Sequence, residues 1–134
     1  LGQPLSGVVH LWSLDEPRCT GIDRAPDTLA GDDELGAISA LAVVQAMARH
    51  PEPAGQLVLV TAGAQAAGAG AVLRPAAAGL WGLAGVIAVE HPELDVLAID
   101  LDGDTPVPDA AALADALAPG RPGPRRLAVR GGHL

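Results

Sequence analysis

Residues 57–70 read LVLVTAGAQAAGAG, an apolar run that passes directly into a segment of glycine and alanine. A short apolar run without polar alternation is typical of a strand that is covered on both faces, as in a parallel sheet. Such sheets place glycine-rich turns at the carboxyl ends of their strands, where many of them hold the phosphates of a dinucleotide. The stretch therefore predicts a buried strand, and its turn is a candidate cofactor loop.

Three further apolar runs and three helical patterns surround this stretch. The expected strands lie at 7–14, 57–60, 94–101 and 126–130, and the expected helices at about 33–49, 75–89 and 109–117. Polar or glycine-rich loops connect them at 15–31, 62–74 and 102–108. The alternation predicts one α/β domain in three layers, with a mainly parallel sheet of about four or more strands and flanking helices.

The helical patterns also predict which faces are buried. In the first helix the apolar stripe is Leu35, Ile38, Leu41 or Ala42, and Gln45, and in the second it is Leu80, Leu83, Ala84 and Ile87. Pro75 suits the first turn of the second helix, and Pro92 ends it. We expect Trp12 and Trp81 to pack in the core or at its edge.

Composition excludes several classes of function. The 134 residues carry a formal net charge of −8, which disfavours binding to nucleic acid. No apolar run is long enough for a membrane span, no leader is recognisable, and the single cysteine, Cys19, fits the reducing cytoplasm. All eight basic residues are Arg, and Tyr is absent. The chain therefore has no P-loop lysine, no Schiff-base lysine and no Tyr–Lys pair for hydride transfer.

The glycines after the strand have the wrong spacing for a dinucleotide loop. Gly63, Gly68 and Gly70 give G-x-x-x-x-G-x-G instead of G-x-G-x-x-G, and the next helix start, Pro75, comes several residues late. A helix has to begin at once if its first amides are to face the phosphates. We therefore expect this loop not to bind a cofactor.

No other constellation predicts catalytic or metal-binding residues. Asp100, Asp102 and Asp104 alternate like a calcium loop, but Thr105 and Ala111 stand where Gly and Glu are needed, so we interpret the acids as solvated turn residues. The four histidines share no helical spacing, and the serines form no nucleophile elbow. These residues are His10, His50, His91 and His133, and Ser6, Ser13 and Ser39.

Residues 80–94, LWGLAGVIAVEHPEL, resemble a helix and turn of one protein family. The match is to the N-terminal structural subdomain of ketoreductase domains in modular type I polyketide synthases. Three other stretches agree in order: VVHLWSLD at 8–15, LVLVTAGAQ at 57–65 and IDLD at 99–102. The resemblance covers essentially the whole chain, and its most specific part is the stretch at 80–94.

This resemblance implies a truncated Rossmann-like fold over residues 1–134, as one piece of a larger multidomain chain. In the family, the N-terminal half binds no NADPH and braces a C-terminal half. That second half carries the cofactor loop and the catalytic Ser, Tyr, Lys and Asn, for which this sequence has no matching positions. NADPH and phosphopantetheine are thus implied only for neighbouring domains of a homodimeric parent. Its enoylreductase, dehydratase and acyl carrier protein domains are further implied partners.

Four readings remain open from the sequence. The parent is an active ketoreductase of acyl-carrier-tethered β-ketoacyl chains, or an inactive pseudo-ketoreductase in which both halves are structural. The chain is otherwise a small free-standing dinucleotide-binding oxidoreductase, or a protein-interaction module. Aligned on Thr61, the loop has Ala62 and Gln65 where a working cofactor loop has glycine, and so resembles a degenerate copy of one.

Overall fold

The computed structural model describes residues 6–15, 34–49, 55–67, 74–102, 106–118 and 125–133. Four strands in these segments form one sheet in the order β1-β2-β3-β4, and all three pairings are parallel. The strands are β1 (Gly7–His10), β2 (Gln56–Ala62), β3 (Asp95–Leu101) and β4 (Arg126–Ala128). The α-helices are α2 (Ser39–Ala48), α3 (Pro75–Glu90) and α4 (Pro106–Ala116). The predicted α/β class with a parallel sheet is confirmed.

The sheet is centred on β2 and β3, which pair along seven residues each, from Gln56 with Asp95 to Ala62 with Leu101. Leu57, Val58, Leu59 and Val60 are all buried, so both faces of β2 are covered. This explains why residues 57–60 show no polar alternation.

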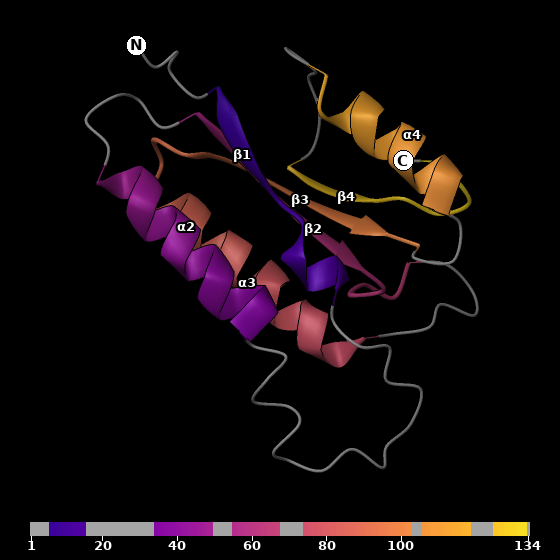
Figure 1. Cartoon of the computed structure of the whole chain (residues 1–134), viewed down its shortest axis with the longest axis horizontal. Coiled ribbons are helices and arrows are strands. Elements are labelled where there is room, and N and C mark those ends of the chain that lie inside the picture. Colours follow the sequence, from indigo (N-terminus) through magenta and orange to yellow (C-terminus); the bar gives the residue numbers. More distant parts are fainter. Residues whose placement is uncertain are drawn as a thin grey trace.

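Two apolar clusters cover the two faces of the sheet. On one face, Leu57, Leu59, Val96 and Ala98 pack against α2 and α3. On the other face, Val58, Val60, Leu97 and Ile99 pack against Ala112 and Ala116 of α4. Figure 1 shows the same three layers, with α2 and α3 on one side of the strands and α4 on the other.

Helix α3 matches its prediction closely. It begins at Pro75 and ends at Glu90, and Leu80, Ala84 and Ile87 are each no more than 3% exposed. The i, i+4 and i+7 spacing places these side chains on one stripe that faces the sheet. The stripe was predicted correctly although α3 also carries exposed apolar side chains, Val86 at 49% and Val89 at 80%.

The predicted strand at 7–14 is wrong beyond His10. The chain leaves the sheet there and forms a single 3₁₀ turn, η1 (Trp12–Leu14). Two backbone hydrogen bonds close this turn, from Leu14 N to Leu11 O and from Asp15 N to Trp12 O. The Ser13 hydroxyl donates to Val60 O of β2 and so fixes the turn to the sheet.

The predicted buried face of the first helix is also wrong. A π-helical turn, η2 (Glu34–Ile38), precedes α2, and Leu35, Ile38 and Leu41 are 39–57% exposed. The buried residues are Ala40 and Val44, with Val43 and Met47 partly buried beside them. A π turn has more residues than an α turn, so it rotates the stripe extrapolated from Leu35 away from the core.

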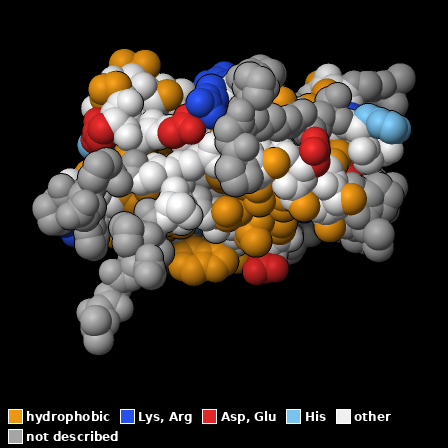
Figure 2. Space-filling model, turned by 90° about the horizontal axis from the view of Figure 1, so that it is seen from above, with side chains coloured by type: hydrophobic (Ala, Val, Ile, Leu, Met, Phe, Trp, Pro, Cys, Tyr) orange, Lys and Arg blue, Asp and Glu red, His pale blue; other side chains and the backbone are white. Residues whose placement is uncertain are grey.

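Large apolar side chains of the first third of the chain are exposed on β1, η1, η2 and α2 and beside them, and we refer to them together as the apolar surface. Its members are Val9, Leu11, Trp12, Leu35, Ile38 and Leu41, and η1 and η2 contact each other within it. Figure 2 shows hydrophobic side chains gathered on one face of the molecule. Within the segments described, no helix is both long and apolar enough to cross a bilayer.

Candidate functional site

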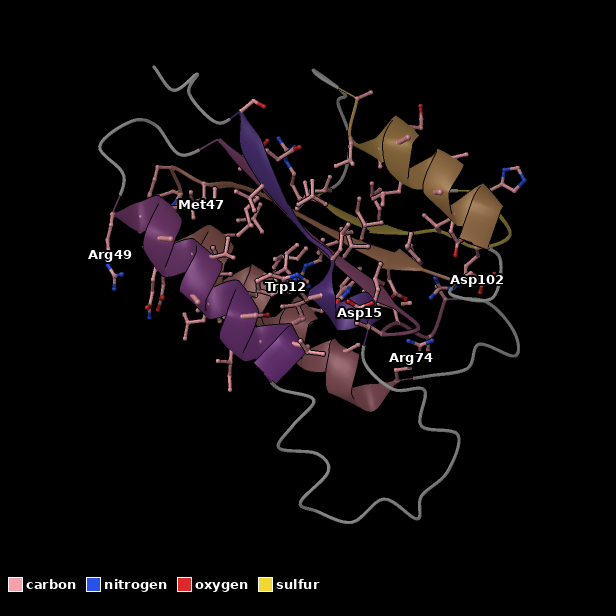
Figure 3. All side chains as sticks on the ribbon, viewed as in Figure 1. Trp12, Asp15, Met47, Arg49, Arg74 and Asp102 are labelled. Carbon is pink, nitrogen blue, oxygen red and sulfur yellow. The ribbon has the colours of Figure 1, made fainter. Side chains whose placement is uncertain are left out.

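The candidate site lies at the carboxyl ends of β2 and β3, where α/β sheets hold their ligands. The chain turns after Ala62 at Gly63, whose φ of 70° favours glycine. Gly63 N donates to Leu101 O at 3.0 Å, and Arg74 N donates to Gly63 O at 2.7 Å. Figure 3 shows Arg74 and Asp102 at this same end of the sheet. The two other glycines of the candidate loop, Gly68 and Gly70, lie outside the described residues.

Asp100 is the centre of this site, and its interpretation as a solvated turn acid is wrong. The residue is 0% exposed, and each carboxylate oxygen accepts two hydrogen bonds. Oδ1 accepts from the Thr61 hydroxyl at 2.7 Å and from Ala64 N at 2.8 Å. Oδ2 accepts from Gln65 N at 3.0 Å and from the Arg130 guanidinium at 2.7 Å. These four bonds saturate the carboxylate.

The other two acids of the predicted trio behave differently. Asp102 is only partly buried, and its carboxylate accepts a hydrogen bond from Gly131 N at 3.3 Å. Asp104 lies outside the described residues. The alternating acids therefore do not act as one group, because Asp100 points into the molecule while Asp102 follows the last residue of β3.

Arg130 joins the loop to the sheet through all five of its N–H donors. Nε donates to Ala67 O at 2.9 Å, and one terminal nitrogen donates to Asp100 O and Val129 O. The other terminal nitrogen donates to Gln65 O and to the Asp100 carboxylate, each at 2.7 Å. The side chain is 21% exposed. Arg130 is not among the residues predicted from the sequence, because nothing in the sequence links it to Asp100.

Trp81 extends this network into α3. Its indole Nε1 donates to Thr61 Oγ1 at 2.9 Å, and the Thr61 hydroxyl in turn donates to Asp100. The Arg126 guanidinium lies 6.0 Å from the indole centroid, within the range of a cation–π contact. The expectation that Trp81 packs at the edge of the core holds, whereas Trp12 is 54% exposed.

An open hollow of about 260 Å³ lies beside this network. Its lining residues are Gln65, Ala66, Ala67, Trp81, Arg126, Leu127 and Ala128. Ligand pockets for molecules of drug size have volumes of roughly 300–1,000 Å³. The hollow is smaller than this range.

His10 is the last residue of β1 and contacts α2. Its Nε2 is 2.7 Å from Ser39 Oγ, and the Ser39 hydroxyl donates its proton to Leu35 O at 2.7 Å. Nε2–H is thus the donor to Ser39, and the buried Nδ1 has no hydrogen-bond partner in the described structure. Among the described residues, no three His, Cys, Asp or Glu side chains gather as they would around a metal ion. Cys19 and His50 lie outside those residues.

We expect His10 to make the chain less stable below neutral pH. Burial lowers the pKa of His10 below its ordinary value of 6.5, so the folded state binds a proton less readily than the unfolded state. The contribution is fully present above pH 6.5 and is lost as the pH falls towards the lower folded-state pKa, by at most about 1.4 kcal/mol per pH unit.

Urea unfolding at pH 7.5, 6.5 and 5.5 measures this effect. The His10→Gln variant should lose less of its free energy of unfolding between pH 6.5 and 5.5 than the unaltered chain. An equal slope in the unaltered chain and the His10 variant would contradict the assignment.

Dinucleotide-binding sheets hold their ligand at the point where the strand order reverses. The four described strands follow one another in a single direction and contain no reversal. Fold and site together define a truncated Rossmann-like domain. In it, an internal carboxylate accepts hydrogen bonds from the amides of the loop after β2. Residues 7–134 match the family described as polyketide synthase extender module SpnB, Rossmann fold domain. The chain belongs to this family.

A solved structure shares the fold. It is described as the adenylation, ketoreductase and pseudo-Asub multidomain structure of a keto acid-selecting NRPS module. The TM-score is 0.75 at 17% sequence identity, over 96% of this chain and 11% of that chain. The match thus covers a small part of that much longer protein. No curated protein matches it in sequence.

Proposed function

We propose that this chain is the structural subdomain of a polyketide synthase ketoreductase and braces a neighbouring catalytic half. That half would bind NADPH and reduce β-ketoacyl chains carried on the phosphopantetheine arm of an acyl carrier protein. Membership of the Rossmann domain family of a polyketide synthase extender module supports this proposal. The fold shared with part of a ketoreductase-containing module is compatible with it.

The observation that carries the proposal is the position of the Asp100 carboxylate. A cofactor phosphate at this end of the sheet would need the free backbone amides of the loop after β2. The amides of Ala64 and Gln65 already donate to Asp100, at 2.8 and 3.0 Å. A phosphate placed there would also lie against a buried negative charge. The loop amides therefore serve to bind Asp100 of the same chain. We propose that Gly63, Gly68 and Gly70 do not bind a cofactor.

The apolar surface supports the bracing role. Exposed apolar patches of several large side chains mark surfaces that contact other proteins. β1 is an edge strand, since it pairs only with β2 in the described structure, and Val9 of β1 is 41% exposed. Trp12, two residues beyond β1, is 54% exposed, and tryptophan is enriched among the residues that dominate binding energy. We propose that the catalytic half covers this surface.

The test uses three samples: this chain, the catalytic half of its parent protein, and the two together. In calorimetric titrations with NADPH, saturable binding should occur only where the catalytic half is present. Adding this chain should also raise the thermal midpoint of the catalytic half, because a ligand of the folded state stabilises it. Saturable micromolar binding of NADPH to this chain alone would support the dinucleotide-binding oxidoreductase instead. An unchanged midpoint of the catalytic half would contradict the bracing role.

A further inference from the structure

The donors around Asp100 have the composition of a site for a small oxyanion. Two consecutive backbone amides, one hydroxyl and one guanidinium converge on the two oxygens of a single carboxylate. We propose that the turn after β2 is an oxyanion-binding site that the chain fills with its own Asp100 side chain. Its ligand class is a small planar carboxylate, and Asp100 acts as a tethered ligand that excludes an external one.

The backbone of the turn has the geometry that such sites use. Gly63 adopts a left-handed conformation, and the amides of Ala64 and Gln65 follow it directly and point to the same carboxylate. Successive amides after a left-handed residue form an anion-binding concavity. The Arg130 guanidinium supplies the positive charge that a buried anion requires.

Bonds that do not involve the Asp100 side chain hold these donors in place. Gly63 N donates to Leu101 O, and Gly63 O accepts from Arg74 N. Four of the five donors of Arg130 go to main-chain oxygens, those of Ala67, Gln65, Val129 and Asp100. Trp81 holds the Thr61 hydroxyl oxygen from α3. The cradle should therefore keep its shape when the carboxylate is removed.

Removing the carboxylate leaves a space that a free anion fills. Asp100→Ala deletes one carboxyl group and keeps Cβ, so the missing atoms correspond to formate. The guanidinium of Arg130, 21% exposed, would then lack its counter-ion, and a partly buried charge without a partner is unfavourable. Formate would restore the four hydrogen bonds that Asp100 accepts. This inference does not rest on the proposed function, because neither cofactor nor partner protein takes part.

The experiment compares thermal unfolding of Asp100→Ala in sodium formate and in sodium chloride at equal ionic strength. Formate at about 0.1 M should raise the midpoint of the variant by about 3–6 °C over chloride, since an anion that binds only the folded state stabilises it. The unaltered chain should show no such difference, because its site is filled. Asp95→Ala is the matched control. It removes the partner of Arg125 from an exposed ion pair at 2.9 Å, and formate should not stabilise it.

A double variant and a refolding assay cover the case in which Asp100→Ala folds poorly. Refolding from urea should then recover more folded protein in formate than in chloride, as judged by the recovered fluorescence of Trp81 in a Trp12→Ser background. In Asp100→Ala/Arg130→Met the advantage of formate should disappear, because the cation is gone. The proposal is overturned if formate and chloride act alike on Asp100→Ala in both assays, or if the double variant keeps the full response.

Discussion

Replacing Arg130 with methionine is expected to lower the free energy of unfolding by about 3–4 kcal/mol. The substitution keeps much of the aliphatic stem and removes the guanidinium. It leaves the Asp100 carboxylate 0% exposed and without its counter-ion, next to four carbonyl oxygens that lose their donors. Removing one member of a buried ion pair costs far more than the pair itself contributes, because the remaining charge stays desolvated.

Urea denaturation followed by circular dichroism measures this loss, and Arg125→Met provides the control. Arg125 and Asp95 also form an ion pair, at 2.9 Å, but their side chains are 58% and 45% exposed. Water screens such pairs, so this substitution should change stability by no more than about 1 kcal/mol. Equal losses in the two variants would mean that burial does not decide the strength of the Asp100–Arg130 pair.

Replacing Trp81 with alanine is expected to cost about 3 kcal/mol. The indole packs against the apolar cluster of α2, α3 and the sheet, and its Nε1 donates to Thr61 at 2.9 Å. Trp81→Phe separates the two effects, because phenylalanine keeps most of the apolar contact and removes the donor. Its expected cost is about 1 kcal/mol, the ordinary net value of one hydrogen bond.

The second tryptophan is the natural control. Trp12 is 54% exposed and contacts His10 edge-on, with 5.6 Å between the ring centroids. Trp12→Ala should therefore lower the stability of the isolated chain by about 1 kcal/mol or less. A loss from Trp12→Ala as large as that from Trp81→Ala would show that the apolar surface is covered within the chain itself, which would weaken its assignment as a docking surface.

Much of the fold could be predicted from local patterns. β2 and β3 read as largely apolar runs without polar alternation, and α3 carries an apolar stripe behind Pro75, so period and punctuation indicate each element. Their boundaries moved by only a few residues. β4 was predicted over 126–130 but ends at Ala128, since Val129 and Arg130 turn into contact with Asp100 and the loop after β2.

The prediction of the buried face failed for the first helix. Residues of α2 are apolar on both sides, so the sequence does not distinguish the buried Ala40 and Val44 from the exposed Leu41. The π turn η2 then sets the rotation of the helix, and its geometry comes from packing against α3 and η1. Which of two apolar stripes becomes buried depends on contacts with residues that are distant in the sequence.

The candidate site was likewise predictable only in part. Local sequence is enough to show that a glycine turn follows a buried strand and that its glycine spacing departs from that of a dinucleotide loop. Folding is needed to bring Asp100 and Arg130 together across 30 residues, where both lie against that turn. Asp100 is an acid inside an otherwise apolar segment, which indicates that it has a partner outside its own strand. Hydrophobic periodicity does not identify that partner. Which buried charges pair depends on their positions in the folded chain. Here the pair of Asp100 and Arg130 ties the turn after β2 to the core.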